Sequence, residues 1–264
     1  MNKNHIDNNS AQVSGYKAPA VQKAFDLLRF VANSEHELGV SELSYHLGFS
    51  KSTTHGLIQA LVRIGALDQS PAQKKVVLGP AIMELVFKGG NYLRIMELAQ
   101  TILEEMCHKI DETVIIGALS KAGATIMATA EPPKKFRISS NIGTPVPLFA
   151  GAAGKIFLAR LDDEEVVKII RKKAGLPQFT PNSIVKESDY LDELAKVRKQ
   201  GYAIDNEEYI PGVKAVAVNL GNIRGFPLGI WTVGYSRSMT DEKMEEIIEE
   251  TMKTAQTLMS NLYL

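Results

Sequence analysis

The chain has 264 residues, of which 45% are hydrophobic and 23% charged, and its 30 basic and 30 acidic side chains balance to a formal net charge of zero. This length suits two domains, and each half is apolar enough to bury its own core. The neutral total favours no class of partner and leaves nucleic-acid binding open, because binding to DNA needs a basic face and not a basic total.

Residues 1–18 are polar and rich in asparagine, and they lack the apolar core of a signal peptide. We expect them to be a disordered lead-in. No apolar run approaches the roughly 20 residues that a membrane helix needs. The single cysteine, Cys107, excludes an internal disulfide and a multi-cysteine metal site. The sequence therefore predicts a cytoplasmic protein that does not bind membranes, and it indicates no cofactor.

Residues 19–87 have the pattern of a winged helix-turn-helix. Helices are expected at 20–32, at 41–47 and from Ser50, the N-cap of the third helix, to Gly65. Gly48 would supply the turn between the second and third helices. Two short strands with a polar tip at Gln69–Lys75 would form the wing. In this motif the third helix lies in the major groove of DNA while the second braces it.

Small hydroxyl side chains and a lysine occupy the start of the third helix. Hydroxyls let the backbone approach a groove closely, and the positive end of the helix dipole favours phosphate. In the wing, two further lysines would hold the DNA backbone. The predicted DNA-binding residues are Ser50, Lys51, Ser52, Thr53, Thr54, His55, Lys74 and Lys75. Small helical bundles without DNA also show two helices and a glycine turn, and Thr53 would then only solvate a helix end.

The rest of the chain is expected to hold a linker helix at 88–109, after a break at Gly89-Gly90, and a second domain at 110–264. Strand-like runs and helical runs are mixed in this domain, which predicts an α+β sensing fold. Strands are expected at 113–119, 124–130, 136–140, 203–204, 214–218 and 228–233. Helices are expected at 151–161, 163–174, 188–200 and 241–262.

The order and spacing of several short motifs resemble the isocitrate lyase regulator (IclR) family of bacterial transcription factors, from about Pro19 to the C-terminal helix. The motifs are VQKA at 21–24, LGFSKST at 47–53, VLG at 77–79, GTPVPL at 143–148, AAGK at 152–155, FT at 179–180, VRKQGYA at 197–203 and DNEEYIPGV at 205–213. The resemblance implies a winged helix-turn-helix, a linker helix and a GAF-like α+β effector-binding domain. It also implies homodimers or homotetramers that bind palindromic double-stranded DNA.

The resemblance further implies an effector cleft at the start of the helix from Gly151, where free backbone N–H groups would suit a carboxylate. Large side chains at two of the positions indicate a flat aromatic or apolar organic acid. The candidates are Met127, Ile138, Phe149, Ala150, Gly151, Ala152, Asp205, Ala215 and Trp231. Ordinary structural roles are the alternative: Trp231 and Phe149 as core, Asp205 as the cap of a turn, and Gly151 as a helix start.

Four residues depart from the family's pattern. Gly56 stands where an arginine is frequent in the recognition helix, which removes a DNA contact and weakens the helix. In the second domain, Phe149 replaces a histidine, Ala215 a cysteine and Asn219 a proline. These three changes argue against transferring a known effector to this chain.

Enzyme activity is not expected. All five histidines precede the second domain, so that domain has no histidine to act as a base or metal ligand. Cys107 and His108 are helical neighbours whose side chains point apart, and Glu207 and Glu208 would face opposite sides of a strand. A remaining alternative is a protein-interaction adaptor whose winged helix no longer binds DNA, which Gly56 and the zero net charge keep open.

Overall fold

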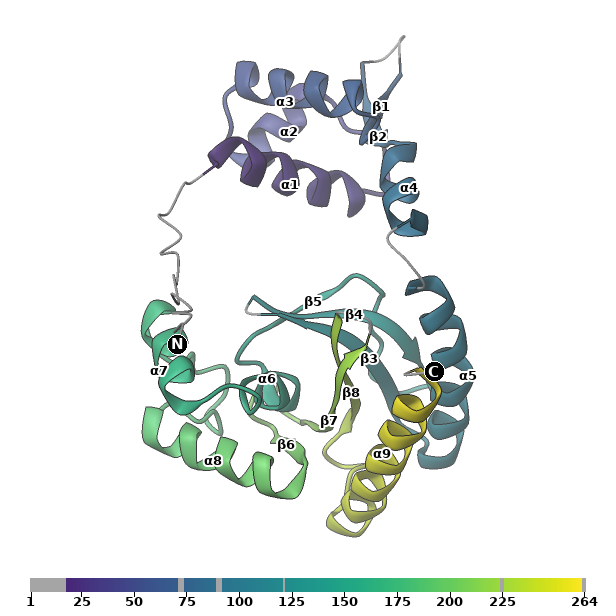
Figure 1. Ribbon diagram of the computed structural model, residues 1–264, viewed down its shortest axis with the longest axis vertical. Coiled ribbons are helices and arrows are strands. Elements are labelled where there is room, and N and C mark those ends of the chain that lie inside the picture. The colour runs from purple at the N-terminus through teal and green to yellow at the C-terminus, as the bar shows by residue number, and fades with distance from the viewer. Residues whose placement is uncertain (1–17, 71–73, 89–91, 121, 224–225, 263–264) are drawn as a thin grey trace, which may run out of the picture. The chain divides into compact units, whose positions relative to one another are not determined.

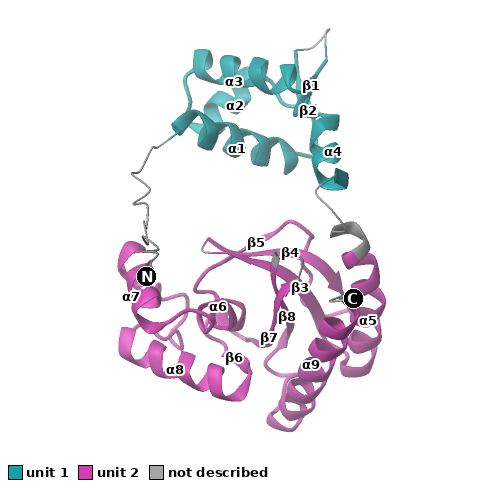
Figure 2. Ribbon diagram, in the orientation of Figure 1, with its two compact units in different colours: residues 1–92 teal, residues 93–264 magenta. Residues whose placement is uncertain are grey.

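The computed structural model describes residues 18–70, 74–88, 92–120, 122–223 and 226–262 (Figure 1). The chain divides into two compact units, Met1–Tyr92 and Leu93–Leu264 (Figure 2). The predicted lead-in, apart from Ala18, and the predicted break at Gly89-Gly90 lie outside the described residues. Within the described ranges, no helix combines the length and the apolar character needed to cross a membrane.

The first unit is a winged helix-turn-helix, as predicted. Its elements are α1 (Pro19–Ala32), α2 (Val40–Leu47), α3 (Lys51–Arg63), β1 (Leu67–Gln69), β2 (Val76–Leu78) and α4 (Pro80–Lys88). Strands β1 and β2 pair antiparallel and form the wing. Apolar residues at helical spacing on the three helices meet residues of the wing in one core: Leu27, Val31, Leu38, Leu43, Ile58, Leu61, Leu67 and Val76.

Local chemistry sets the turn between α2 and α3. Gly48 takes the left-handed conformation with φ of 65°, which ends α2. Glycine adopts this conformation with little steric strain because it has no Cβ. Ser50 follows in an extended conformation, and its hydroxyl accepts a hydrogen bond from the Thr53 backbone N–H at 3.1 Å. This is the N-cap expected from the sequence. Helix α3 ends at Arg63, just before Gly65.

The second unit contains one six-stranded sheet in the order β5-β4-β3-β8-β7-β6, with every neighbouring pair antiparallel. Its strands are β3 (Thr113–Ser120), β4 (Gly123–Ala130), β5 (Pro145–Pro147), β6 (Tyr202–Asn206), β7 (Val213–Ile223) and β8 (Phe226–Tyr235). Its helices are α5 (Tyr92–Ile110), α6 (Gly151–Leu158), α7 (Asp163–Lys172), α8 (Glu187–Gln200) and α9 (Asp241–Leu262). The α+β class is therefore confirmed.

The sheet has a separate core on each face. Helices α5 and α9 cover one face, through residues such as Leu103 and Ile247. Helix α6 covers the other face, and α7 and α8 pack outside it (Figure 1). All eight residues of α6 are buried, so this helix lies in the middle of a layer and not at the surface. The second core therefore holds the start of α6, where the effector site is expected.

One predicted strand is wrong. Residues 136–140 form no strand, and β5 at Pro145–Pro147 takes the edge of the sheet beside β4 instead. Glu131 explains the difference, because its carboxylate accepts hydrogen bonds from Arg137 Nε at 2.7 Å and Ser139 Oγ at 2.6 Å. These side-chain bonds fold the segment back on itself, so its backbone does not pair with a strand.

Candidate DNA interface and effector site

One face of α3 is open to solvent. The exposed residues recur at the spacing of one helical turn: Lys51, His55, Gln59 and Arg63. Sequence reasoning proposed the first two and missed Gln59 and Arg63, although the same spacing of four residues would have found them. Ser52 is also exposed, and Thr53 is half-buried. The face presents a lysine, an arginine, a histidine and an amide, which are side chains that contact phosphates and base edges.

Thr54 belongs to the packing of the motif and not to this face. Its side chain is fully buried. The hydroxyl donates to the Ser50 carbonyl at 3.1 Å and accepts from Ser44 Oγ of α2 at 2.9 Å. Thr54 therefore fixes the angle between α2 and α3, and in this structure it does not reach the surface that would meet DNA.

The two lysines of the wing lie just before β2. Lys74 is exposed, with φ of 54°, and Lys75 is half-buried. The Lys74 carbonyl accepts from Gln69 Nε2 at 3.1 Å, and Gln59 Nε2 of α3 donates to Gln69 Oε1 at 3.4 Å. Gln69 thus ties the wing to the exposed face of α3. The expected residues 71–73 of the wing tip lie outside the described part of the chain.

Gly56 lies on the exposed face of α3, and a Cβ built there has no atom within 4 Å. We expect Gly56→Ala to stabilise the first unit by about 1 kcal/mol, because alanine loses less backbone entropy in a helix interior. Urea unfolding of the full chain, followed by circular dichroism, measures the change. Gly48→Ala is the matched control: its Cβ is equally free of neighbours, but φ is 65°, so it should destabilise by about 1 kcal/mol. Equal effects of both variants would contradict this account.

In the second unit, the structure gathers seven of the nine effector candidates. Ala150 caps the start of α6, followed by Gly151 and Ala152. Asp205 of β6 pairs with Ala215 of β7. The set is completed by side chains of the same core: Phe149 and Trp231. Met127 and Ile138 are half-buried and do not pack into this core.

Trp231 fills the core beside β3. A Cβ at Gly117 would come within 2.3 Å of the indole ring, so the ring lies directly over that glycine. Met127 is the unpaired residue where the register of β3 and β4 shifts, between the pairs Ile116–Ala128 and Gly117–Ile126. The Ile138 carbonyl accepts from Thr113 Oγ1 at 2.6 Å. These contacts give all three residues structural roles.

A carboxylate of the protein itself lies at the start of α6. Gly151 has φ of 47°, and a Cβ there would stand 1.9 Å from Asp205 Oδ2. Asp205 Oδ1 accepts from the Glu208 backbone N–H at 2.7 Å, so Asp205 also caps the turn after β6. Burial raises the pKa of Asp205 to about 6, and the neighbouring Glu208 adds to the rise, although hydrogen bonds from backbone N–H groups oppose it.

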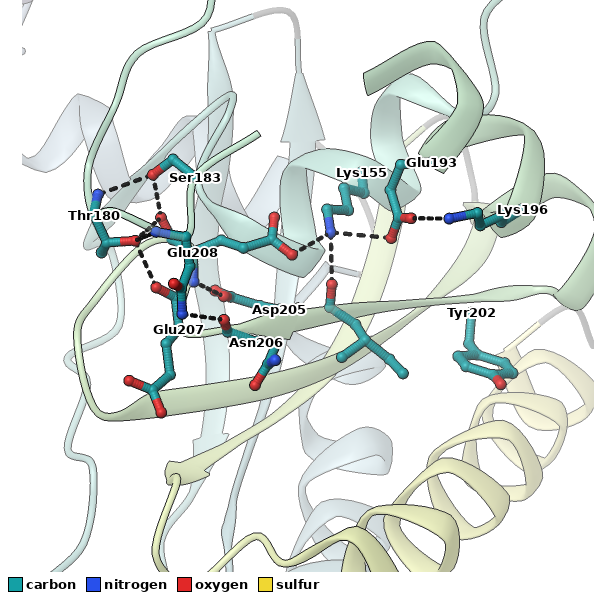
Figure 3. A network of polar contacts seen from close by, with 12 residues as sticks. Lys155, Thr180, Ser183, Glu193, Lys196, Tyr202, Asp205, Asn206, Glu207 and Glu208 are labelled. Carbon is teal, nitrogen blue, oxygen red and sulfur yellow. Dashed lines mark hydrogen bonds and ion pairs between the residues drawn. The ribbon is translucent and has the colours of Figure 1, made fainter. Parts of the chain in front are cut away.

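Lys155 is a buried cation that sequence reasoning did not assign to the site. It lies on α6 with its side chain 1% exposed. Its ammonium donates to Glu208 Oε1 and the Ile204 carbonyl, both at 2.7 Å, and to Glu193 Oε1 at 3.2 Å (Figure 3). Three donors therefore meet three acceptors, which is the condition for burying an ammonium group. The network links α6, α8 and the turn after β6.

The same turn is tied to the segment before α8. Thr180 Oγ1 donates to the Glu207 carbonyl at 2.7 Å, and Ser183 Oγ donates to the Glu208 carbonyl at 2.7 Å (Figure 3). Glu207 and Glu208 lie in this turn and not on a strand as predicted. Their side chains still point apart, because Glu207 accepts from the Gly212 backbone N–H at 2.9 Å while Glu208 binds Lys155.

The described residues offer no set of three or more metal-ligating side chains. Cys107 is buried on α5, and burial raises the pKa of its thiol to about 11, which disfavours the reactive thiolate. The geometry is that of a protein with an exposed recognition helix in one unit and a buried polar cluster in the other.

Comparison with known proteins supports the division into a helix-turn-helix unit and a second, separate domain. The family model for the C-terminal domain of the bacterial transcriptional regulator IclR matches residues 91–260, and the IclR helix-turn-helix model matches residues 20–71. The acetate operon repressor of Salmonella typhimurium is 27% identical over 252 residues, which are 93% of this chain and 90% of the repressor.

Solved structures share the fold. An IclR transcriptional regulator from Alicyclobacillus acidocaldarius superposes with a TM-score of 0.76 at 25% identity, over 93% of this chain and 99% of that one. An IclR homologue from Microbacterium hydrocarbonoxydans, solved with 4-hydroxybenzoate, superposes with a TM-score of 0.75 at 17% identity, over 92% and 98% of the two chains. The family consists of transcription regulators and not of enzymes. The chain belongs to the IclR family of bacterial transcriptional regulators.

Proposed function

We propose that this chain is a cytoplasmic homo-oligomer that binds operator DNA through the exposed face of α3 and the wing, and that an organic acid bound near the start of α6 changes its affinity for DNA. The observation that carries the proposal is the exposed row on α3, which begins at a capped helix N-terminus with Lys51. In the homo-oligomer, the effector and the operator would each bind best to one arrangement of the DNA-binding units. Binding of one would therefore change the affinity for the other.

Lys51→Ala tests the DNA interface. The change should weaken binding to operator and to unrelated DNA alike and should lower the slope of log affinity against log salt by about 1, because one phosphate contact is lost. Fluorescence anisotropy with labelled DNA at several salt concentrations measures the slope. Lys168→Ala is the control, since this lysine is exposed on α7 of the second unit and should leave the slope unchanged. An unchanged slope in Lys51→Ala would exclude a phosphate contact at this residue.

An acid is proposed for two reasons. A helix N-terminus attracts anions, and a structural neighbour was solved with an aromatic acid, 4-hydroxybenzoate. Because Asp205 already lies against Gly151, a second carboxylate there would meet a negative charge unless Asp205 is protonated. A site at the start of α6 would therefore bind an acid together with a proton.

This coupling predicts a pH dependence. The pKa of Asp205 is raised to about 6, so the neutral form prevails below that pH and the charged form above it. The affinity for benzoate should rise about tenfold or more as the pH falls from 7.5 to 5.5. Calorimetric titration measures it, with Asp205→Asn as the control that removes the titrating group and should remove the pH dependence. A wild-type affinity that does not change with pH would contradict an anion beside Asp205.

A further inference from the structure

Two hollows lie against the segment that precedes α8. The inner hollow is also lined by Tyr190 of α8 and by Glu208, and the outer hollow by Pro147 and Leu148, which precede α6, and by Lys173 and Gly175, which follow α7. The outer hollow is about 210 Å³ and the inner one about 10 Å³. They share three lining residues: Phe149, Pro177 and Phe179. The outer hollow is open to solvent, and its volume is larger than that of an aromatic ring. The space therefore suits a single planar ring.

One residue that lines the inner hollow, Tyr190, has a hydroxyl group without a partner. Tyr190 of α8 is 3% exposed, and its hydroxyl makes no hydrogen bond to any described residue. A buried hydroxyl without a partner is costly, so this atom marks a place where a ligand group or a water molecule is favoured. The inner volume is close to the size of one water-sized probe, which matches one polar atom of a ligand.

The neighbouring side chains define which polar group fits. Glu208 also lines this hollow, and its negative charge disfavours an anion there. Ser183 also lines it, but its hydroxyl already donates to the Glu208 carbonyl and accepts from two backbone N–H groups. The polar groups left for a ligand are the Tyr190 hydroxyl and the Glu208 carboxylate. A ligand hydroxyl is complementary to both, because it can accept a hydrogen bond from Tyr190 and donate one to Glu208.

The other walls are apolar. Leu176, Pro177 and Ile184 line the inner hollow, and Phe149 and Phe179 line both the inner and the outer hollow. The Phe149 ring meets the Tyr190 ring edge to face, with centroids 6.1 Å apart. We propose that the two hollows form a binding site for a small phenol, with its ring against Phe149 and Phe179 and its hydroxyl at Tyr190.

Calorimetric titration of the full chain with p-cresol and with toluene tests the proposal without DNA. These probes differ by one hydroxyl, so p-cresol should bind at least about tenfold more tightly, because a site that pairs a hydroxyl rejects the analogue without it. Equal affinities for the two probes, or no binding of p-cresol, would overturn the proposal. Neither result bears on DNA binding by α3, so the two failures are distinguishable.

Tyr190→Phe locates the site. The variant should lose about tenfold in affinity for p-cresol and keep its affinity for toluene, while its melting temperature stays equal or rises because an unpaired buried hydroxyl is removed. Tyr202→Phe is the matched control, since it makes the same change on β6, and it should bind p-cresol like the wild type. If Tyr190→Phe bound p-cresol as tightly as the wild type, the ligand would not lie at this hydroxyl.

Discussion

Replacement of Lys155 by methionine should lower the free energy of unfolding of the second unit by about 3–5 kcal/mol. The methionine fills the volume of the lysine stem, but it leaves the carboxylates of Glu208 and Glu193 without their shared cation. It also leaves the Ile204 carbonyl without its donor. Removing one member of a buried charge network costs more than the network contributes, because the remaining charges stay buried without a partner.

Urea unfolding followed by tryptophan fluorescence measures this loss. Trp231 is the only tryptophan in the chain, so the signal reports the second unit. Lys196→Met is the matched control: this lysine binds the same Glu193 at 3.4 Å but is 70% exposed, so its loss should cost less than about 1 kcal/mol. If the two variants were equally stable, Lys155 would not hold α6, α8 and the turn together.

Gly151→Ala should destabilise the second unit by about 3 kcal/mol. Part of the cost, about 1 kcal/mol, is the left-handed backbone with φ of 47°. The rest arises because the new Cβ overlaps Asp205 Oδ2, so the carboxylate must turn away from its bond to the Glu208 backbone N–H. The same tryptophan signal during urea unfolding measures the loss.

Gly212→Ala separates the two causes of that loss. Gly212 also has a positive φ, of 74°, but its Cβ would have no atom within 4 Å. We expect this control to cost about 1 kcal/mol, the backbone part alone. Similar losses in both variants would show that Asp205 does not press against the start of α6.

The first unit was predictable because its signals are local. Ser50 caps α3 by accepting a hydrogen bond from the backbone N–H of Thr53, only three residues later. Gly48, which ends α2, lies in the same turn. Thr54 was misplaced in the DNA interface because its burial depends on Ser44, ten residues away on another helix. A hydroxyl at the start of a helix looks the same in sequence whether it faces solvent or a neighbouring helix.

In the second unit, the sequence alone predicted the strand and helix types but not the polar cluster. Lysine is rarely fully buried, so nothing marked Lys155 as the centre of a network whose partners lie 38 to 53 residues away. Residues 136–140 alternate like a strand, but the side-chain hydrogen bonds to Glu131 decide their conformation. The family motif identified Gly151 and Asp205, whereas their mutual contact is visible only in three dimensions.

A mobility-shift assay with the DNA upstream of this chain's own gene, repeated with a panel of aromatic and aliphatic carboxylates, tests whether the chain binds DNA under the control of an acid. We expect a salt-sensitive shift by the wild type, a weaker shift by Lys51→Ala, and a change in the wild-type shift with at least one acid. A folded protein that shifts neither this DNA nor other promoter fragments at low salt would contradict this expectation and would favour the adaptor alternative.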